Sequence, residues 1–378
     1  MTASSLSVIP RSLRVEQLKR LSFLCGLTVG GRKEELITRL NAAVDNPPLP
    51  LPSRSRAGPV VLSIDLGIRN LAFSLLAPVP SSVPVPRKAS PKSKKNSGAT
   101  PPPSFLATSP PSIKLHAWQR LSLLENPTGV LAQKGDEDAL DVDTTTGVFA
   151  PAALAKTANT FLQETVLRFK PLPTHILIER QRWRSGGGTA VLEWTLRVNT
   201  LEAMLHASLR TLRDVGVWKG EVLSVRPERV GQLFLDADGL STRRATPKTE
   251  LKEDETGAST TKPKKKRTTS TEIKKLKIEL LNQWLSQGDP IVQPGTVEVG
   301  HMLDAYRDVP KAPKRSRSKR VTEEDGPRGD LPTLDKKLDD LTDSLMQGMA
   351  WLRWQDNIAL LRTESGVEQL LGQGTKYA

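Results

Sequence analysis

The sequence has a single cysteine, Cys25, among its 378 residues. One thiol forms no internal disulfide and provides no cysteine pair for a zinc site. Cys25 lies within an apolar helical pattern, so we expect a buried core residue rather than a reactive thiol.

Aromatic residues are also scarce, at 4% of the chain, and no apolar run approaches the length of a membrane span. The 29 prolines gather largely in a few polar segments. This distribution predicts a globular body interrupted by disordered inserts. We expect no membrane partner and no small-molecule substrate.

Acidic residues are missing from long stretches, with none between Asp65 and Glu125, and the net charge is +14. A strongly basic chain favours polyanionic partners, above all nucleic acid. The first 33 residues hold one acid, Glu16, and resemble a mitochondrial transit segment, whereas PKKKR at 263–267 resembles a nuclear import signal. The sequence leaves mitochondrion and nucleus open.

The N-terminal region contains two runs with apolar residues at helical spacing. These residues are Val15, Leu18, Leu21 and Cys25, followed by Leu36, Ile37 and Leu40. Gly26 is placed to end the first helix, and Gly30 and Gly31 to make the turn. A generic basic helical pair is one interpretation of this pattern.

The stretch LCGLTVGGRKEELITRL at 24–40 also resembles the core of a SAP module, a small DNA-binding unit. The resemblance implies an all-helical domain at 10–45 in which Arg32, Lys33 and Arg39 contact phosphates. A proline-rich linker at 46–59 follows, so we expect this domain and the body to move independently.

The body, residues 60–365, alternates apolar strand-like runs with amphipathic helical runs. Expected strands cover 60–64, 71–76, 112–124, 174–180 and 221–227, and expected helices cover 151–169, 189–214, 271–285 and 334–361. This order predicts an α/β fold with a mixed five-stranded sheet flanked by helices. Disordered basic inserts are expected near 78–112, 240–272 and 308–331.

Acidic residues stand at unusual places in this layout. Asp65 and Glu179 each end a buried apolar strand, where an ionised carboxylate is costly unless it is paired or binds a cation. Asp339, Asp340 and Asp343 lie on the half-apolar last helix, where Asp343 shares a face with either of the other two. Taken singly, Asp65 could cap a turn and the helical acids could form a solvated face.

Taken together, these carboxylates favour a site for hard divalent cations. We expect two Mg²⁺ ions about 4 Å apart, with Mn²⁺ as a substitute, that activate water and stabilise the leaving oxygen of a phosphodiester.

The segments SIDLGIRN, ILIERQRWRSGG and KKLDDLTDSLMQG, in this order, resemble the RuvC-type branch of the ribonuclease H-like nucleases. More closely, they resemble the fungal mitochondrial Holliday junction resolvases. The resemblance implies a ribonuclease H-like sheet with Asp65, Glu179 and Asp343 as acidic-site residues. The fourth acid stays open between Asp339 and Asp340.

By this resemblance we expect a homodimer that cuts opposed strands of four-way junction DNA with paired symmetric nicks. Residues near the acids, most of them basic, are expected to contact DNA: Arg69, Asn70, Arg180, Gln181, Arg182, Trp183, Arg184, Lys274, Lys275, Lys277, Lys336 and Lys337. In the expected helix at 271–285, Ile273 is predicted to face inward and the three lysines outward.

Three other functions remain to be weighed. A noncatalytic junction-binding or architectural protein would keep the fold but lose an acid, and no acid is visibly lost. Another ribonuclease H-like nuclease shares the metal chemistry. An actin-like kinase or ATPase would need Ser or Thr after Gly67, where the sequence has Ile68.

Overall fold

A computed structural model describes residues 9–46, 58–79, 107–124, 147–181, 192–235, 270–287, 291–309 and 338–372. Most of each predicted insert and most of the linker lie outside these ranges. Five predicted DNA contacts also lie outside them: Arg182, Trp183, Arg184, Lys336 and Lys337. No helix in the described ranges is long and apolar enough to cross a membrane.

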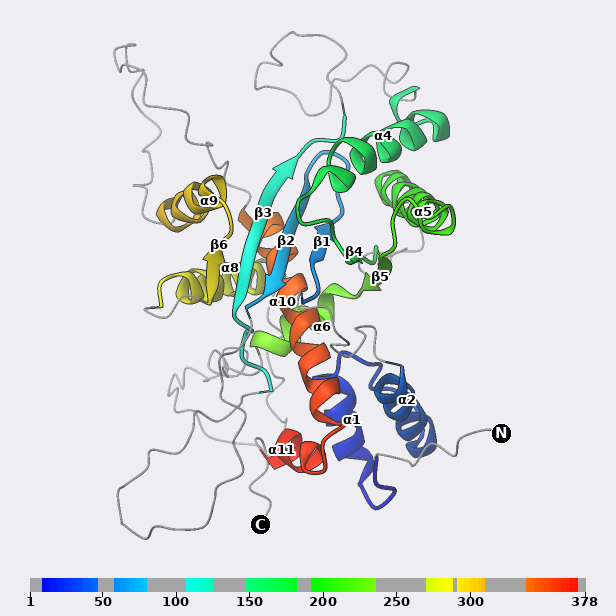
Figure 1. The fold of residues 1–378 in the computed structure, drawn as a ribbon, viewed down its shortest axis with the longest axis vertical. Helices are drawn as coiled ribbons and strands as arrows, with labels where there is room; N and C mark the ends of the chain where they lie inside the picture. The colour runs from blue at the N-terminus through cyan, green and yellow to red at the C-terminus, as the bar shows by residue number, and fades with distance from the viewer. Residues whose placement is uncertain are drawn as a thin grey trace, which may run out of the picture.

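A mixed sheet forms the centre of the body, in the order β5-β4-β1-β2-β3-β6 (Figure 1). Only β2 runs antiparallel to the others. The strands are β1 (Val61–Asp65), β2 (Leu71–Pro78), β3 (Ile113–Leu121), β4 (His175–Glu179), β5 (Glu221–Val225) and β6 (Val292–Pro294). The predicted mixed α/β fold is confirmed, and β6 adds a sixth strand that the sequence did not reveal.

Side chains alternate across the sheet, so each buried strand serves two hydrophobic layers. Leu62 and Ile64 of β1 pack under α4 (Pro151–Glu164) and α5 (Glu193–Asp214). Val61 faces the opposite layer. A short 3₁₀ helix, Val166–Arg168, follows α4. Burial on both faces explains why β1 and β4 are continuous apolar runs rather than alternating ones.

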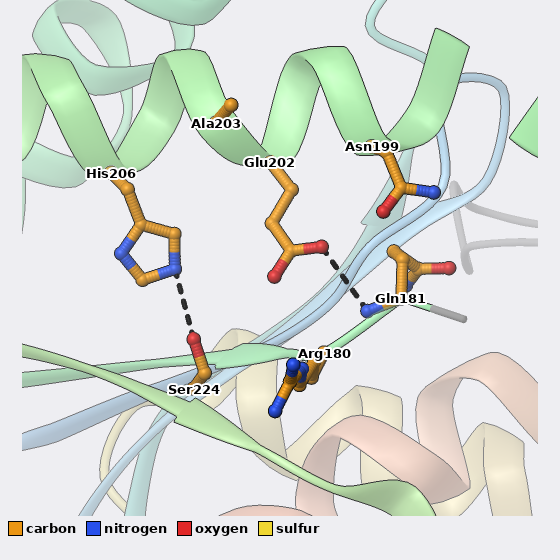
Figure 2. A pocket seen from close by; sticks show the side chains of 7 residues that line it. All are labelled: Arg180, Gln181, Asn199, Glu202, Ala203, His206 and Ser224. Carbon is orange, nitrogen blue, oxygen red and sulfur yellow. Dashed lines mark hydrogen bonds between the residues drawn. The ribbon is translucent and has the colours of Figure 1, made fainter. Parts of the chain in front are cut away.

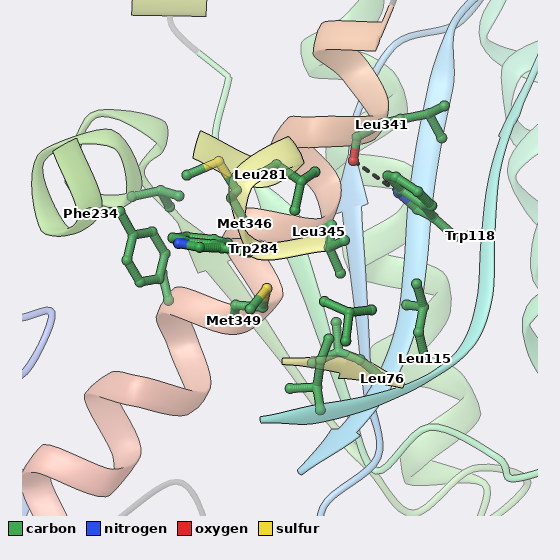
Figure 3. Close-up of a cluster of buried hydrophobic side chains, with 14 of the residues drawn as sticks. Leu76, Leu115, Trp118, Phe234, Leu281, Trp284, Leu341, Leu345, Met346 and Met349 are labelled. Carbon is green, nitrogen blue, oxygen red and sulfur yellow. Dashed lines mark hydrogen bonds between the residues drawn. The ribbon is translucent and has the colours of Figure 1, made fainter. Parts of the chain in front are cut away.

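The opposite layer is built around α10 (Leu338–Leu360), with α6 (Pro227–Leu235), α8 (Ser270–Leu285) and α9 (Val297–Asp308) beside it. Met346 and Met349 of α10 and Trp284 of α8 fill its centre, and the Trp118 indole donates a 3.0 Å hydrogen bond to the Leu341 carbonyl (Figure 3). The long helix is therefore fixed against the strands. Helices α6 and α9 were not among those expected from the sequence.

The N-terminal helices α1 (Val15–Leu24) and α2 (Lys33–Asp45) pack beside the C-terminal end of α10 and against α11 (Gly366–Gly372) (Figure 1). Leu18, Leu21 and Cys25 share one hydrophobic core with Ile358 and Leu361. Cys25 is buried, as predicted. The SAP assignment of this helix pair stays a prediction.

The expectation that the helix pair and the body move independently is wrong in this structure. Asn357 donates a 2.6 Å hydrogen bond to the Leu24 carbonyl, and Arg229 donates a 2.9 Å bond to Thr28. Gly26 has φ +68°, and a Cβ there would come 2.4 Å from the Trp354 ring. The linker composition suggested freedom, but the apolar extension of α10 provides a docking surface.

Candidate active site

Two acidic side chains meet at the carboxyl ends of the central strands. β1 and β4 are parallel neighbours, and Ile64 pairs with Ile178, so Asp65 and Glu179 follow at adjacent positions. Ser63, two residues before Asp65 and therefore on the same face of the sheet, accepts a 3.1 Å hydrogen bond from Gln347 of α10. Asp65 and its neighbour Glu179 thus face that helix. The Asp65 and Glu179 side chains hydrogen-bond to each other.

Helix α10 brings the remaining acids to this edge. The Gln347 amide also donates a 3.2 Å hydrogen bond to the Ile64 carbonyl, one residue before Asp65. The Ser74 hydroxyl of β2 donates a 3.0 Å bond to the Ser344 carbonyl. These buried contacts fix the register of the helix, so its first turns lie over the strand ends.

Burial raises the pKa of Asp65 well above its usual value, and the hydrogen bond to Glu179 adds to this effect. The negative charges of Glu179, Asp343 and Asp340 raise the pKa further. The structure therefore brings four of the predicted acids together. The fifth predicted acid, Asp339, pairs with Lys274 of α8, and its carboxylate lies 2.5 Å from the Lys274 ammonium.

Two lysines of α8 face the acids across the interface with α10. Lys277 pairs with Asp343, and its side chain is only 12% exposed. The hydrogen bond to Asp339 raises the pKa of Lys274. The predicted orientation of this helix is wrong at two residues, because Lys277 faces inward and Ile273 is 37% exposed, whereas Lys274 and Lys275 are exposed as predicted. The helix turns its lysines to the acids because opposite charges there offset the cost of burying carboxylates.

The donor set suits a hard divalent cation, because all four grouped side chains provide carboxylate oxygens. Within the described ranges, however, no three Asp, Glu, His or Cys side chains stand close enough to form a complete metal cage. Lys277 holds one of the carboxylates in this conformation. The residues fit the chemistry of such an ion, and the lysine must yield for Asp343 to join as a ligand.

The predicted DNA contacts divide into several groups. Arg69 is exposed in the connection between β1 and β2, with its guanidinium 5.7 Å from the centre of the Trp194 ring, and Asn70 follows it. Arg180 and Gln181 continue from Glu179 at the same edge of the sheet. Lys275 is exposed on α8.

Three further predicted contacts lie far from the acids, on the N-terminal helix pair. Arg32 is exposed at the start of α2, and Lys33 is partly exposed. Arg39 donates to the carbonyls of Thr28 and Gly30, the latter at 3.0 Å, so its guanidinium holds the loop between α1 and α2.

Sequence reasoning missed a polar group beside the acids, on the α5 side of the sheet. Asn199, Glu202 and His206 of α5 and Ser224 of β5 line a cavity there with Arg180 and Gln181 (Figure 2). Three of these side chains stand at i, i+3 and i+7 on the helix, a polar stripe that the sequence does contain.

Comparison with known proteins gives one family match and several individual ones. The model of the family described as "Mitochondrial resolvase Ydc2 / RNA splicing MRS1" matches residues 61–361. The chain is 31% identical over 196 residues to cruciform cutting endonuclease 1, mitochondrial, of Schizosaccharomyces pombe. That alignment covers 52% of this chain and 55% of the relative, so it spans about half the length of each.

Two solved structures are also similar. The yeast mitochondrial Holliday junction resolvase Ydc2 matches with a TM-score of 0.47 at 20% identity, over 92% of this chain and 95% of that one. The Fowlpox virus resolvase with Holliday junction DNA matches with a TM-score of 0.29 at 11% identity, over 78% and 96%. At TM-scores below 0.5, neither likeness carries an argument about this site.

The family match extends from the first residue of β1 to the residue after the end of α10. It therefore includes every strand of the sheet and all five acids. The chain belongs to the family described as mitochondrial resolvase Ydc2 / RNA splicing MRS1.

Proposed function

We propose that this protein is a metal-dependent, structure-selective endonuclease that resolves four-way DNA junctions by paired nicks in opposed strands. The observation that carries the proposal is the meeting of Asp65 and Glu179 at adjacent parallel strand ends, under the negative charges of Asp340 and Asp343. A fold does not gather four carboxylates without a compensating role, because like charges at close range repel.

We infer that Asp65, Glu179, Asp340 and Asp343 hold the divalent cation, with Mg²⁺ as the physiological ion and two ions per site. Asp340 is preferred to Asp339 as the fourth ligand because its charge acts on Asp65, whereas Asp339 is engaged by Lys274. When bound, such ions polarise a phosphodiester and lower the pKa of an attacking water.

The chain's own residues would orient the substrate around these acids. Lys277 is held at the site by Asp343, and release from that carboxylate would leave its ammonium beside the phosphate. Arg180 directly follows Glu179, and Arg69 lies four residues after Asp65, so we expect both near the path of a DNA strand. Because guanidinium groups neutralise phosphate charge, these residues are expected to position the backbone rather than choose its sequence.

We further propose that the protein acts as a homodimer in mitochondria. A junction has two opposed strands to cut, and the described residues contain one acidic cluster, so paired nicks need two copies. The relatives named as mitochondrial support this compartment over the nucleus.

The decisive experiment is a cleavage assay on four-way junctions with a fixed and a mobile core, with each strand labelled in turn. Linear duplex and RNA–DNA hybrid serve as alternative substrates, and a chelator replaces Mg²⁺ in parallel reactions. We expect paired symmetric nicks on junctions alone, lost in chelator and in Asp65→Asn. Cutting of the hybrid would indicate a different nuclease of the same fold class.

A noncatalytic junction-binding protein is the second candidate, because the family description also includes an RNA splicing protein. That function needs the basic surface but not the acids. It predicts tight junction binding without nicking under every metal condition, and equal binding by wild type and Asp65→Asn.

A further inference from the structure

A cavity of about 350 Å³ opens at the carboxyl ends of β4 and β5, beneath α5 (Figure 2). Its volume is at the small end of the range for ligand sites, which is about 300–1,000 Å³. Six polar residues line it: Arg180, Gln181, Asn199, Glu202, His206 and Ser224. The acidic site uses none of the three from α5.

The cavity begins one residue away from the acids. Successive side chains of an extended segment point to opposite faces of a sheet, so Glu179 faces the α10 side and Arg180 the α5 side. Consecutive Cα atoms lie about 3.8 Å apart. The acids and the cavity therefore lie at the same end of the sheet, where a DNA strand with one phosphate at the acids would bring a neighbouring nucleotide toward the cavity.

Hydrogen bonds hold the lining in place but leave groups facing the opening. Glu202 accepts a 3.1 Å bond from the Gln181 backbone N–H, and the Gln181 side chain donates to the Leu66 carbonyl at 3.3 Å. His206 and Ser224 pair at 3.2 Å. A carboxylate has about four acceptor positions, so Glu202 retains capacity to accept from a ligand.

The charge of the lining argues against a phosphate as the ligand. Arg180 and Glu202 carry opposite charges, and burial lowers the pKa of His206, which favours its neutral form. A phosphate in this cavity would face the Glu202 carboxylate. A neutral group with both donors and acceptors fits better, and the edge of a nucleobase has this character.

We propose that the cavity receives one unstacked base beside the phosphate that is cut, and that Glu202 selects a base with an exocyclic amino group. Carboxylates accept hydrogen bonds from the cytosine amino group, whereas thymine has a carbonyl at the same position. Unstacking a base costs least where pairing is already interrupted, as at a junction core. This inference rests on the proposed junction-cutting function and adds a basis for sequence preference.

The test compares junctions that differ only in the base next to the cut, cytosine or thymine, on each side in turn. Wild type is expected to cut the cytosine junction faster on one side. Glu202→Gln keeps an acceptor for the Gln181 N–H but replaces a second acceptor by a donor, so the preference should fall by about tenfold. Glu221→Gln is the matched control on β5, since its partner Arg213 lies 3.7 Å away outside the cavity.

A second measurement does not depend on cutting. The adenine analogue 2-aminopurine, placed beside the cut in a bound junction, should gain fluorescence with wild type and the control but not with Glu202→Gln. Such a gain without any nicking would support the base site while the endonuclease proposal failed. An equal preference for the cytosine junction in wild type and Glu202→Gln would overturn the inference. Faster cutting of both junctions by the variant would also overturn it, because it would indicate a phosphate site.

Discussion

Replacing Asp65 by Asn should stabilise the metal-free protein while abolishing cutting. Asp65 is half-buried beside Glu179, and the charges of Asp340 and Asp343 also raise its pKa. Coulomb's law gives about 3 kcal/mol for two unit charges about 5 Å apart at an effective dielectric constant of about 20. Protonation already relieves part of this repulsion, so we expect a net gain of about 1 kcal/mol, or about 2–4 °C in Tm.

The pH dependence of this gain has a definite sign. The pKa of Asp65 is higher in the folded chain than in the unfolded chain, so the folded protein binds more protons between those two values. Stability of the metal-free wild type therefore falls as pH rises through that window. The Asn variant lacks this dependence, and the difference in Tm between the two should be largest above the folded pKa.

Magnesium should act in the opposite direction. A ligand present at about 100 times its Kd stabilises the folded state by about 2.7 kcal/mol, which is several degrees in Tm. Thermal unfolding with Mg²⁺ and with chelator should show this increase in wild type and a much smaller one in Asp65→Asn. Asp304→Asn, an exposed change on α9, should respond as wild type does.

If Asp65→Asn has a lower Tm in chelator than wild type does, the electrostatic argument is refuted. An undiminished response of Asp65→Asn to Mg²⁺ would refute the assignment of this carboxylate as a metal ligand. The two outcomes are separable because the first is measured without metal.

Three more changes test other parts of the structure. Lys277→Ala removes the ammonium that faces Asp343 and should lower the free energy of unfolding in urea by about 1–3 kcal/mol without metal. Mg²⁺ should reduce this loss, and an equal loss with and without metal would contradict the role of Lys277. Gly348→Ala would place a Cβ 2.4 Å from a leucine methyl of β2 and should lower the free energy of unfolding by about 1–3 kcal/mol. Gly300→Ala on α9, where a Cβ has space, should leave stability unchanged or raise it. Similar effects of the two changes would argue against the tight contact of α10. Arg32→Ala should reduce the log–log salt dependence of DNA binding by about 0.9 if this residue contacts a duplex phosphate, and an unchanged slope would exclude that contact.

The strand-end acids could be predicted because a buried carboxylate has few physical explanations. Asp65 and Glu179 each close an apolar run, and the structure places them on adjacent parallel strands. The long helices were predictable for the same kind of reason, since their apolar residues repeat at helical spacing. β6 has three residues, too few to show any periodicity.

The inward position of Lys277 on α8 could not be predicted, because periodicity assumes one apolar face against one apolar core. This helix packs beside an acidic cluster, so Lys277 turns inward and Ile273 is partly exposed. The docking of the N-terminal helices was hidden for a related reason. The composition of a linker says nothing about whether Ile358 and Leu361 at the far end of the chain offer a surface to cover.

The charge balance of the site connects its fold to its chemistry. Lys274 and Lys277 face a cluster that includes Asp339 and Asp343 in addition to the acids at the strand ends. The negative charges of Glu179, Asp343 and Asp340 repel that of Asp65 in the metal-free cluster. The raised pKa of Asp65 is one form of relief, and a divalent cation would be a stronger one. The same repulsion therefore favours metal binding, and we expect the metal to displace Lys277 from Asp343 and leave its ammonium available to the phosphate.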